Sequence, residues 1–396
     1  MRICLAPNKV YKNLFLLLNC IGLIACFINI KIGVLSSILI VLICFEHFNS
    51  ELFFSDTAFI IYLLSCLISG IAYLWNDRPI TIFFAAISFN VFPSLLFYLG
   101  RYIAQKNETD IVIEKMLNAF VFMMLIGTVT YLLFPNFYFN YMGQSIDSYT
   151  YGLGEYRYGS FISSIALGSV GTISTILYFY TFDKLQIWQK ALYLPLIILN
   201  VLMSMQRAAW IITGVAIISC VLLKFGRNKK TRYRLLGLLL FLLLVIAIFW
   251  YNRTAIFTTI QLTYFERRIS VINLNDMSSS RVTQWSDAWN VFLNNPLTGY
   301  GLGSCGQKAA PYGLSIVTDG NHLRILAEIG IIGFLAFVYM NIRAICFSLH
   351  QKKYYFVLVI LLCNLAAIGS PIFDQYYASF AYWLILGVAT KKYRSR

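Results

Sequence analysis

Long apolar runs recur from one end of the chain to the other, and they limit its fold more than any other feature. About twelve are long enough to cross a bilayer as a helix, and they cover 14–30, 32–46, 57–75, 80–99, 112–134, 159–182, 189–204, 207–223, 234–251, 322–347, 353–369 and 372–390. Only 12% of the 396 residues are charged, roughly half the share found in a soluble domain. The sequence therefore predicts an all-α, polytopic membrane protein.

The lysine and arginine residues predict which side of the membrane each loop faces, because cytoplasmic loops are enriched in them. With the N-terminus inside, most of the 31 basic residues fall in inner segments, including a dense run from Lys224 to Arg234. One inner loop, 46–56, has none. We expect both termini to be cytoplasmic. The net charge of +15 then reflects topology, which makes nucleic-acid binding a poor explanation for it.

On this topology two long outer segments, 135–158 and 252–321, interrupt the helices. The chain divides into helices in 1–251, a large outer loop at 252–321, and three helices with a cytoplasmic tail at 322–396. The large loop is predicted to contain a short amphipathic helix, capped near Ser280 and ended by Asn294-Asn295-Pro296. A glycine-rich turn follows at 299–303. This segment has the composition of a catalytic loop, although an ordinary surface loop with a helix would show the same spacing.

Three outer arginines indicate a site for an anion. Arg157, Arg207 and Arg281 each lie where a helix is expected to start, and free N–H groups there favour negative charge. A guanidinium beside them would complete a phosphate site, whereas a single such arginine could be an interface residue. Gly168 follows Arg157 after ten residues, and with Gly171 it should let a neighbouring helix approach closely.

Further polar residues on the predicted outer face are candidates for binding substrate. Tyr156 and Tyr158 belong to an aromatic segment that would suit either the membrane interface or sugar rings. Arg324 and Glu328 are four residues apart on one helix and should pair. The remaining candidates are Tyr300 in the glycine-rich turn and Asp319 in the large loop.

His322 is the candidate base, since the other two histidines, His47 and His350, lie in inner loops. It follows Asn321, which is the expected N-cap of the span at 322–347. A helix N-terminus disfavours imidazolium, so we expect a neutral ring that can accept a proton. The alternative is an interface histidine that is hydrogen-bonded to the loop.

The cysteine and carboxylate residues indicate no disulfide bond and no bound metal ion. Cys305 is the only cysteine expected in the large loop, so no disulfide framework is predicted. No Asp-x-Asp motif and no cluster of histidine, cysteine and carboxylate residues lies in the outer segments. The sequence therefore predicts neither a metal nor a cofactor.

Together these residues resemble the O-antigen polymerase and O-antigen ligase superfamily. The architecture is similar over most of the chain. The motifs that carry the resemblance are Ser280-Arg281, Trp285, Trp289, Asn295-Pro296, Gly299-Tyr300-Gly301-Leu302-Gly303, Asn321-His322, Glu328-Ile329-Gly330 with Gly333, Ser204-Met205-Gln206-Arg207, and Arg157 with Gly168.

The resemblance implies an O-antigen polymerase of the bacterial inner membrane, a glycosyltransferase that contributes to lipopolysaccharide biosynthesis. Such an enzyme transfers the growing chain from undecaprenyl pyrophosphate onto a new lipid-linked repeat unit at the periplasmic face. The resemblance implies that Arg157, Arg207 and Arg281 bind pyrophosphate and that His322 acts on the acceptor. The implied partners are the undecaprenyl-pyrophosphate-linked oligosaccharide, membrane lipids, and a chain-length regulator and a flippase of the same pathway.

Two positions depart from the family pattern, and two other functions remain open. An Arg-x15-Gly motif counted from Arg281 would need glycine at Leu297, and Gly299 comes two residues later. Ligases, which transfer the polymer to lipid A-core, tend to have a polar residue where this chain has Leu323. That departure favours a polymerase. A lipid-linked oligosaccharide flippase is the third possibility, but the spans have few charged residues near their middles.

Overall fold

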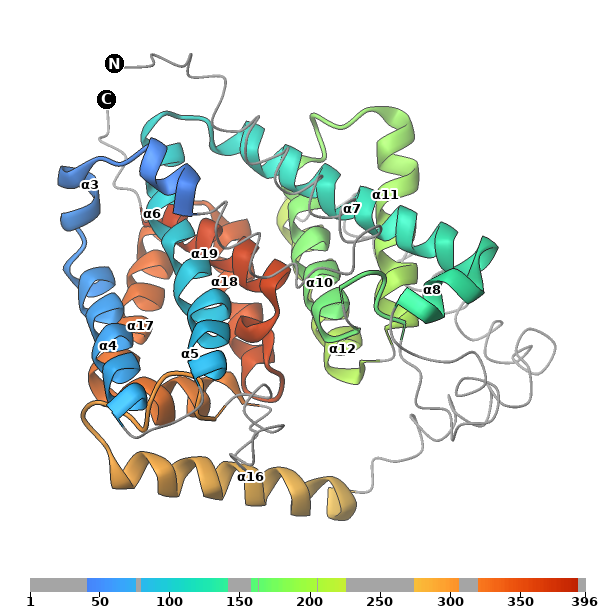
Figure 1. Cartoon of the computed structure of the whole chain (residues 1–396). Helices are drawn as coiled ribbons and strands as arrows, with labels where there is room; N and C mark the ends of the chain where they lie inside the picture. The colour runs from blue at the N-terminus through green and yellow to red at the C-terminus, as the bar shows by residue number, and fades with distance from the viewer. Residues whose placement is uncertain are drawn as a thin grey trace.

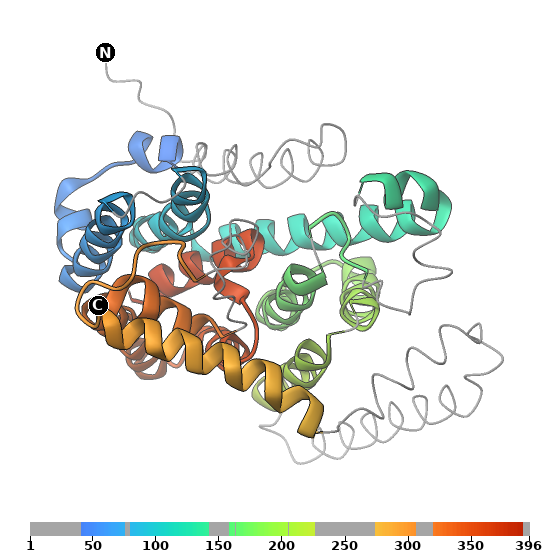
Figure 2. The same cartoon turned by 60° about the horizontal axis from the view of Figure 1, so that its bottom comes forward.

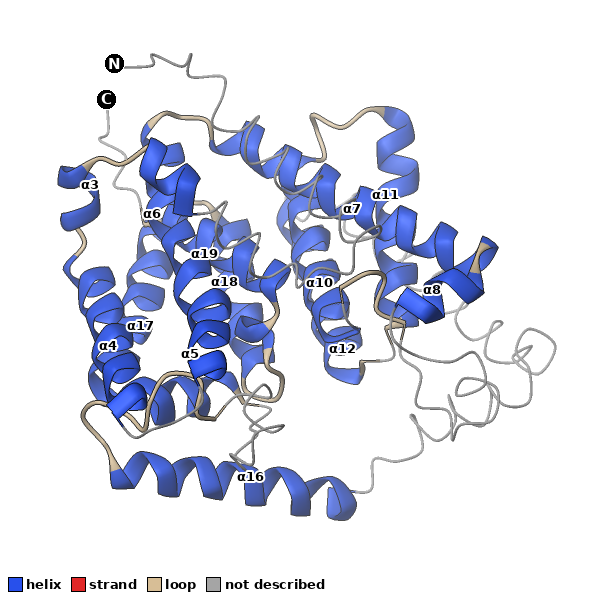
Figure 3. Ribbon diagram, in the orientation of Figure 1, coloured by secondary structure: helices blue, strands red, loops and turns tan. Residues whose placement is uncertain are grey.

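The structure is a computed structural model that describes residues 41–75, 80–141, 158–162, 164–204, 206–225, 274–305 and 320–390. Within these ranges helices are the only regular secondary structure (Figure 3). The all-α prediction is therefore confirmed for the described part of the chain. The expected spans at 14–30 and 234–251 lie outside the described residues, as does most of 32–46, so the number of twelve stays a prediction.

Where the expected spans are described, the helices match them to within a few residues. The span at 80–99 consists of α5 (Ile80–Ala86), a π-helical turn (Ile87–Val91) and α6 (Phe92–Gln105). The other spans correspond to α4 (Thr57–Trp75), α7 (Thr109–Leu133), α10 (Ser164–Thr181), α11 (Ile187–Met203), α12 (Arg207–Phe225), α17 (Asn321–His350), α18 (Tyr354–Ala367) and α19 (Tyr376–Ala389). The shorter elements are α3 (Ser50–Phe54), α8 (Pro135–Tyr141) and the 3-10 turn η3 (Ile372–Asp374).

Several helices have the length and surface of membrane spans. In the described part of the chain α4, α7, α12 and α17 are each long and apolar enough to cross a bilayer. Their outer faces are apolar, with Ile68 and Ile71 exposed on α4 and Ile211 and Leu222 exposed on α12. Water would not stabilise such surfaces, whereas lipid would. The protein is therefore a multi-pass membrane protein.

Glycines allow α10 to pack tightly against its neighbours, as the sequence predicts. A Cβ on Gly168 would lie 2.7 Å from the Cβ of Ala209 on α12, and one on Gly171 would lie 2.2 Å from Val201 on α11. Since real Cβ atoms do not approach so closely, only glycine fits at either position. The close approach expected from these two glycines is confirmed.

Ion pairs join the helix ends on one side of the molecule. The buried carboxylate of Asp56, just before α4, contacts Arg101 at 3.3 Å and also contacts Arg343, which links the start of α4 to α6 and α17. A second pair joins Lys184 to Asp110 at 2.7 Å. These residues all belong to segments predicted to be inside. We call this side the basic end, and its assignment to the cytoplasm stays a prediction.

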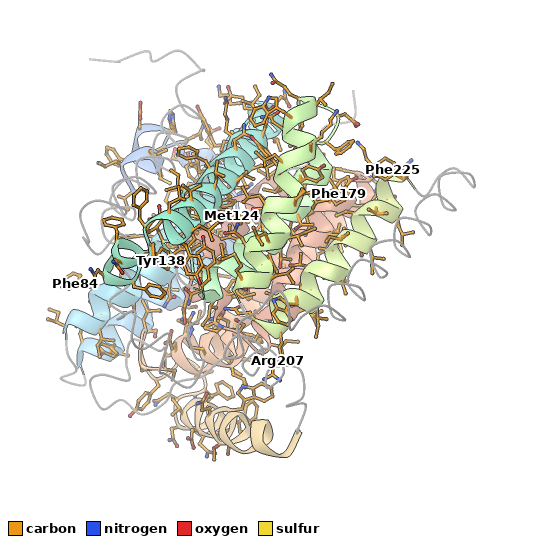
Figure 4. The ribbon with its side chains drawn as sticks, turned by 90° about the vertical axis from the view of Figure 1, so that its right-hand side faces the viewer. Phe84, Met124, Tyr138, Phe179, Arg207 and Phe225 are labelled. Carbon is orange, nitrogen blue, oxygen red and sulfur yellow. The ribbon has the colours of Figure 1, made fainter. Side chains whose placement is uncertain are left out.

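The other side of the molecule, which we call the α16 end, is crossed by α16 (Leu274–Asn294) (Figures 1 and 2). The first residues of α12 and α17 also lie at this end. Figure 4 shows Arg207 at the end of α12 that is nearer to α16, and Phe225 at the opposite end of the helix. The starts of α12 and α17, both predicted to be outside, therefore lie on the same side as α16.

Helix α16 is longer than the sequence indicates. It ends at Asn294, as predicted, but it begins at Leu274, so Ser280 lies inside the helix and does not cap it. The prediction that Arg281 lies at a helix start is therefore wrong, and its role in binding an anion stays a prediction.

Helix α10 also starts elsewhere. The expected span begins at residue 159, but α10 begins at Ser164. Ser160 has a φ of 51°, a left-handed conformation that a right-handed helix excludes. Residues 158–162 therefore form a turn, and the helix start expected near Arg157 is several residues further along the chain.

Helix α17 is broken at Gly330, although the sequence predicts one continuous span. Gly330 has φ 72° and ψ −178°, which divides α17 into residues 321–329 and 331–350. The segment 296–301 fills the break. Ile331 N–H donates to Pro296 O at 2.8 Å, and Tyr300 N–H donates to Ala327 O at 2.8 Å. The backbone groups released by the break are thus satisfied by the loop that precedes α17.

The glycine-rich turn has the conformation that this docking requires. Gly299, Gly301 and Gly303 all have positive φ values, of 76°, 123° and 89°. A Cβ on Gly299 would lie 2.1 Å from the carbonyl oxygen of Glu328. These glycines are therefore needed for the loop to pack against α17.

Candidate functional site

His322 lies in the first turn of α17, as predicted, but its helix is capped differently. Gly320 is the N-cap, in an extended conformation. Asn321, the expected cap, lies inside the helix and is fully buried. Its side-chain oxygen accepts the N–H of Phe373 at 2.8 Å and so holds η3 against α17. The cap prediction is wrong because the carboxamide is used for this longer-range contact.

The ring of His322 is held by α18 and by aromatic side chains. Its Nε2 lies 2.9 Å from the carbonyl oxygen of Asn364. Because a carbonyl only accepts hydrogen bonds, Nε2 must carry the hydrogen, and the lone pair of the neutral ring is on Nδ1. The rings of Phe334, Phe337 and Phe373 pack against it at centroid distances of 6.1–6.5 Å. The ring is half-buried and held in place, with Nδ1 as its basic atom.

A buried charge cluster lies one turn beyond His322. Arg324 is 4% exposed, and its Nε lies 3.9 Å from Glu328, which confirms the predicted pair. The guanidinium also contacts the carboxylate of Asp374 in η3, and Nη2 lies 3.3 Å from Oδ1 of Asn90. Glu328 Oε1 accepts the N–H of Cys305 at 3.1 Å. One buried arginine thus joins α17, η3, the π-helical turn and, through Glu328, the glycine-rich segment.

Two members of this cluster, Asp374 and Asn90, are not among the site residues predicted from the sequence. Asp374 lies near the start of the last expected span, 372–390, and it is the only acidic residue after Glu328. Asn90 is the only carboxamide residue in the apolar span 80–99. An ionisable or amide group in such surroundings is costly unless it has a partner or a function. The occurrence of each residue in an apolar segment could therefore have marked it as a candidate.

The space within the cluster is too small for a sugar. A cavity of about 20 Å³ is lined by Arg324 and Glu328 together with Tyr62, Phe373 and Trp383, and it has room for roughly one water molecule. Both charged side chains are almost wholly buried, so their predicted role in binding substrate stays a prediction. Within the described ranges no three histidine, cysteine or carboxylate side chains gather closely enough to hold a metal ion.

Arg207 begins α12, which confirms its predicted place at a helix start. Its neighbours Gln206 and Ala208 line a second cavity of about 20 Å³, together with Ser370 and Ile372 from the connection between α18 and α19. His322 contacts the same part of the fold through Asn364 and Phe373. The residues between α18 and α19 therefore lie between the start of α12 and His322.

Tyr158 lies in the interior of the protein. It is 3% exposed, and its ring stacks on Tyr138 with 5.6 Å between centroids. Its hydroxyl lies 3.3 Å from Thr128 Oγ1, and burial raises the pKa of that hydroxyl. The expectation that this ring faces the outer surface is wrong, because the aromatic side chains of α7 and α8 enclose it.

Of the remaining predicted site residues, the structure describes Tyr300 and Arg281. Tyr300 is half-buried and packs with Phe292 against the interface of α16 and α17. Arg281 lies in the N-terminal half of α16. Arg157, Tyr156 and Asp319 lie outside the described residues, so convergence of the three arginines on one ligand stays a prediction.

Comparison with known proteins gives one family match, over part of the chain. A family model described as O-antigen ligase matches residues 192–338, a range that includes Arg207, α16 and His322. No curated protein matches the chain. Members of the matched family are glycosyltransferase-like enzymes that act on lipid-linked sugars. This match supports the resemblance of the motifs in residues 192–338 to the O-antigen polymerase and ligase superfamily.

Proposed function

We propose that the protein is an O-antigen polymerase of the bacterial inner membrane. It would elongate an undecaprenyl-pyrophosphate-linked oligosaccharide at the periplasmic face by transferring the growing chain onto a new lipid-linked repeat unit. The observation that supports this proposal most directly is the position of His322. His322 belongs to the residues that match the family model and lies at the α16 end. Its half-buried ring is held by the carbonyl oxygen of Asn364.

His322 would act as the general base. Nδ1 takes the proton of the acceptor hydroxyl while the hydroxyl oxygen attacks the anomeric carbon of the donor sugar. The bond between that carbon and the pyrophosphate oxygen breaks, and the lipid pyrophosphate leaves with the bonding electrons. Holding both substrates at one place supplies much of the remaining acceleration.

The arginines would bind the lipid pyrophosphate and stabilise the charge that develops on it as it leaves. Arg207 at the first residue of α12 supports this role, because its guanidinium adds to the free N–H groups of the helix start. We assign Arg157 and Arg281 to the same ligand from the resemblance of their motifs. A flippase would supply the lipid-linked repeat units, and a chain-length regulator would act on the same enzyme.

A ligase is the second candidate, because the matched family model is described as O-antigen ligase. Both activities break the same bond and use the same donor, and they differ in the acceptor. A polymerase uses another lipid-linked repeat unit, whereas a ligase uses lipid A-core. The apolar Leu323 that follows His322 favours the polymerase.

Purified protein in lipid nanodiscs would separate these functions. Lipid-linked repeat units are supplied alone or together with lipid A-core, and the products are resolved by gel electrophoresis. We expect a ladder on the lipid carrier without lipid A-core. Transfer to lipid A-core alone would identify a ligase. In proteoliposomes, transport of unchanged repeat units without any new glycosidic bond would identify a flippase and contradict both transferase assignments.

A further inference from the structure

A buried polar network lies behind His322, where α17, α18 and α19 meet. The side-chain amide of Asn364 on α18 donates to Oδ1 of Asn341 on α17 at 2.9 Å. The hydroxyl of Tyr382 on α19 donates to the same oxygen. Tyr382 is fully buried, and Asn341 is 6% exposed. Polar side chains inside a membrane protein are costly, so a hydrogen-bonded set of three calls for an explanation.

This network fixes the residue whose backbone carbonyl binds His322. Asn364 also donates to Ile360 O at 2.8 Å and lies 3.3 Å from the hydroxyl of Tyr382, so its position is set from three directions. Its own carbonyl is available because α18 ends here. The N–H of Ile368, which would reach Asn364 O in a continuing helix, bonds to Leu365 O at 3.3 Å instead.

The network also touches the aromatic walls around His322. Phe373 lies 4.6 Å from Tyr382 and Phe337 lies 6.3 Å from it, measured between ring centroids. Both phenylalanines contact the imidazole. In addition, the side chain of Asn341 donates to Phe337 O at 2.9 Å. Any change in the network should therefore reach His322 through its carbonyl partner and through its packing.

We propose that Asn341, Asn364 and Tyr382 are positioning residues that keep the hydrogen of His322 on Nε2 and leave Nδ1 as the reacting atom. The consequence for catalysis rests on the proposed transferase function. When Nδ1 takes a proton, the resulting cation keeps its hydrogen bond to a carbonyl at the C-terminal end of α18. That end of a helix favours positive charge. The network should therefore assist the chemical step more than the binding of substrate.

Nuclear magnetic resonance can read the tautomer without any activity measurement. The His47→Gln/His350→Gln variant leaves His322 as the only histidine in the chain. Labelled with ¹⁵N-histidine and studied in lipid bilayers near neutral pH, it should show a protonated Nε2 and an unprotonated Nδ1. A protonated Nδ1 in the neutral ring would overturn the proposal, whatever the variants below show.

Tyr382→Phe tests whether the network is the cause. This variant removes one hydroxyl, and Asn364 keeps its bonds to Asn341 and Ile360. We expect the two tautomers to become mixed, and kcat to fall several-fold while KM for the lipid-linked donor stays the same. Tyr178→Phe is the matched control, because it removes a buried tyrosine hydroxyl that donates to Lys190 O at the basic end. It should leave the tautomer and kcat unchanged.

The outcomes separate this proposal from the function on which it rests. An unchanged tautomer and an unchanged kcat in Tyr382→Phe would overturn the role of the network. A wild-type protein with the hydrogen on Nε2, but with neither polymerase nor ligase activity, would contradict the proposed function. The NMR result would then still support the placement of the ring.

Discussion

The imidazole of His322 lies between two helix ends of opposite partial charge. The first turn of α17 is positive and disfavours a second positive charge, whereas the last turn of α18 offers a carbonyl to Nε2–H. The sequence predicts the first effect, because it depends on neighbours in the chain. It could not predict the second, since Asn364 belongs to a different helix. A ring placed in this way suits a base that must take up a proton and release it in each cycle.

Replacing His322 should nearly abolish transfer. Loss of a general base typically lowers the rate by about 10²–10⁴-fold, and we expect this for His322→Ala. His322→Gln keeps a polar group without a usable base and should be almost as slow. The measurement is the rate of chain elongation by purified protein, with His350→Ala as the control at the basic end. Elongation by His322→Ala at close to the wild-type rate would leave His322 as an interface residue.

Loss of Arg324 should destabilise the protein rather than only slow it. Its removal leaves Glu328 and Asp374 close together without their cation, and such a change typically costs about 3–5 kcal/mol. We expect Arg324→Met to melt well below the wild type in detergent. Lys184→Ala breaks an ion pair whose two side chains are half exposed, and exposed pairs contribute about 1 kcal/mol or less. Similar melting temperatures for the two variants would contradict a structural role of the cluster.

This cluster shows which parts of the site the sequence can predict. The pair of Arg324 and Glu328 follows from a spacing of four residues on one helix. The contacts to Asp374 and Asn90 join segments that are distant in the chain, and no periodicity connects them. The core position of Tyr158 has the same origin, since the aromatic side chains that enclose it come from α7 and α8.

At the scale of the element, helix existence is predictable and helix interruption is not. Hydrophobic length places α4 and α12 almost to the residue, because a membrane requires continuous apolar runs. The break in α17 depends on the loop at 296–301, which supplies partners for the interrupted backbone. Gly330 alone, inside an apolar span, does not indicate that such a partner exists. The sequence therefore predicts a continuous helix at 322–347.

Gly330→Ala should disturb the break and the loop that fills it. An alanine there would have to keep a positive φ, which costs on the order of 1–3 kcal/mol, and its Cβ would lie 2.2 Å from Leu297 O. We expect lower thermal stability and reduced activity. Gly214→Ala in α12 is the control, because no atom lies within 4 Å of a Cβ there. That change should be neutral or stabilising by about 0.5–1 kcal/mol. Equal melting temperatures would show that α17 tolerates a regular conformation at Gly330.

At the scale of the whole molecule, the separation of the basic end from the α16 end predicts the orientation in the membrane. A cysteine introduced at Ser286, an exposed position on α16, should react with an impermeant maleimide in spheroplasts. A cysteine at Lys352, exposed at the basic end, should react only after permeabilisation. Both are made in a background that lacks the exposed Cys346. The reverse labelling pattern would place His322 in the cytoplasm and remove the basis for the proposed function.

The break in α17 also sets the depth at which a lipid-tethered substrate would be met. At 1.5 Å per residue, the part at 331–350 is about 30 Å long, which already matches the hydrocarbon core of a bilayer. A straight continuation would raise His322 into the water above the membrane. Residues 321–329 instead lie across the end of the bundle beside α16 (Figure 1). The ring therefore stays close to the end of the bundle. On the proposed function, this is the level at which the charge of an isoprenoid pyrophosphate would lie, and the incoming sugar would have to descend to meet it.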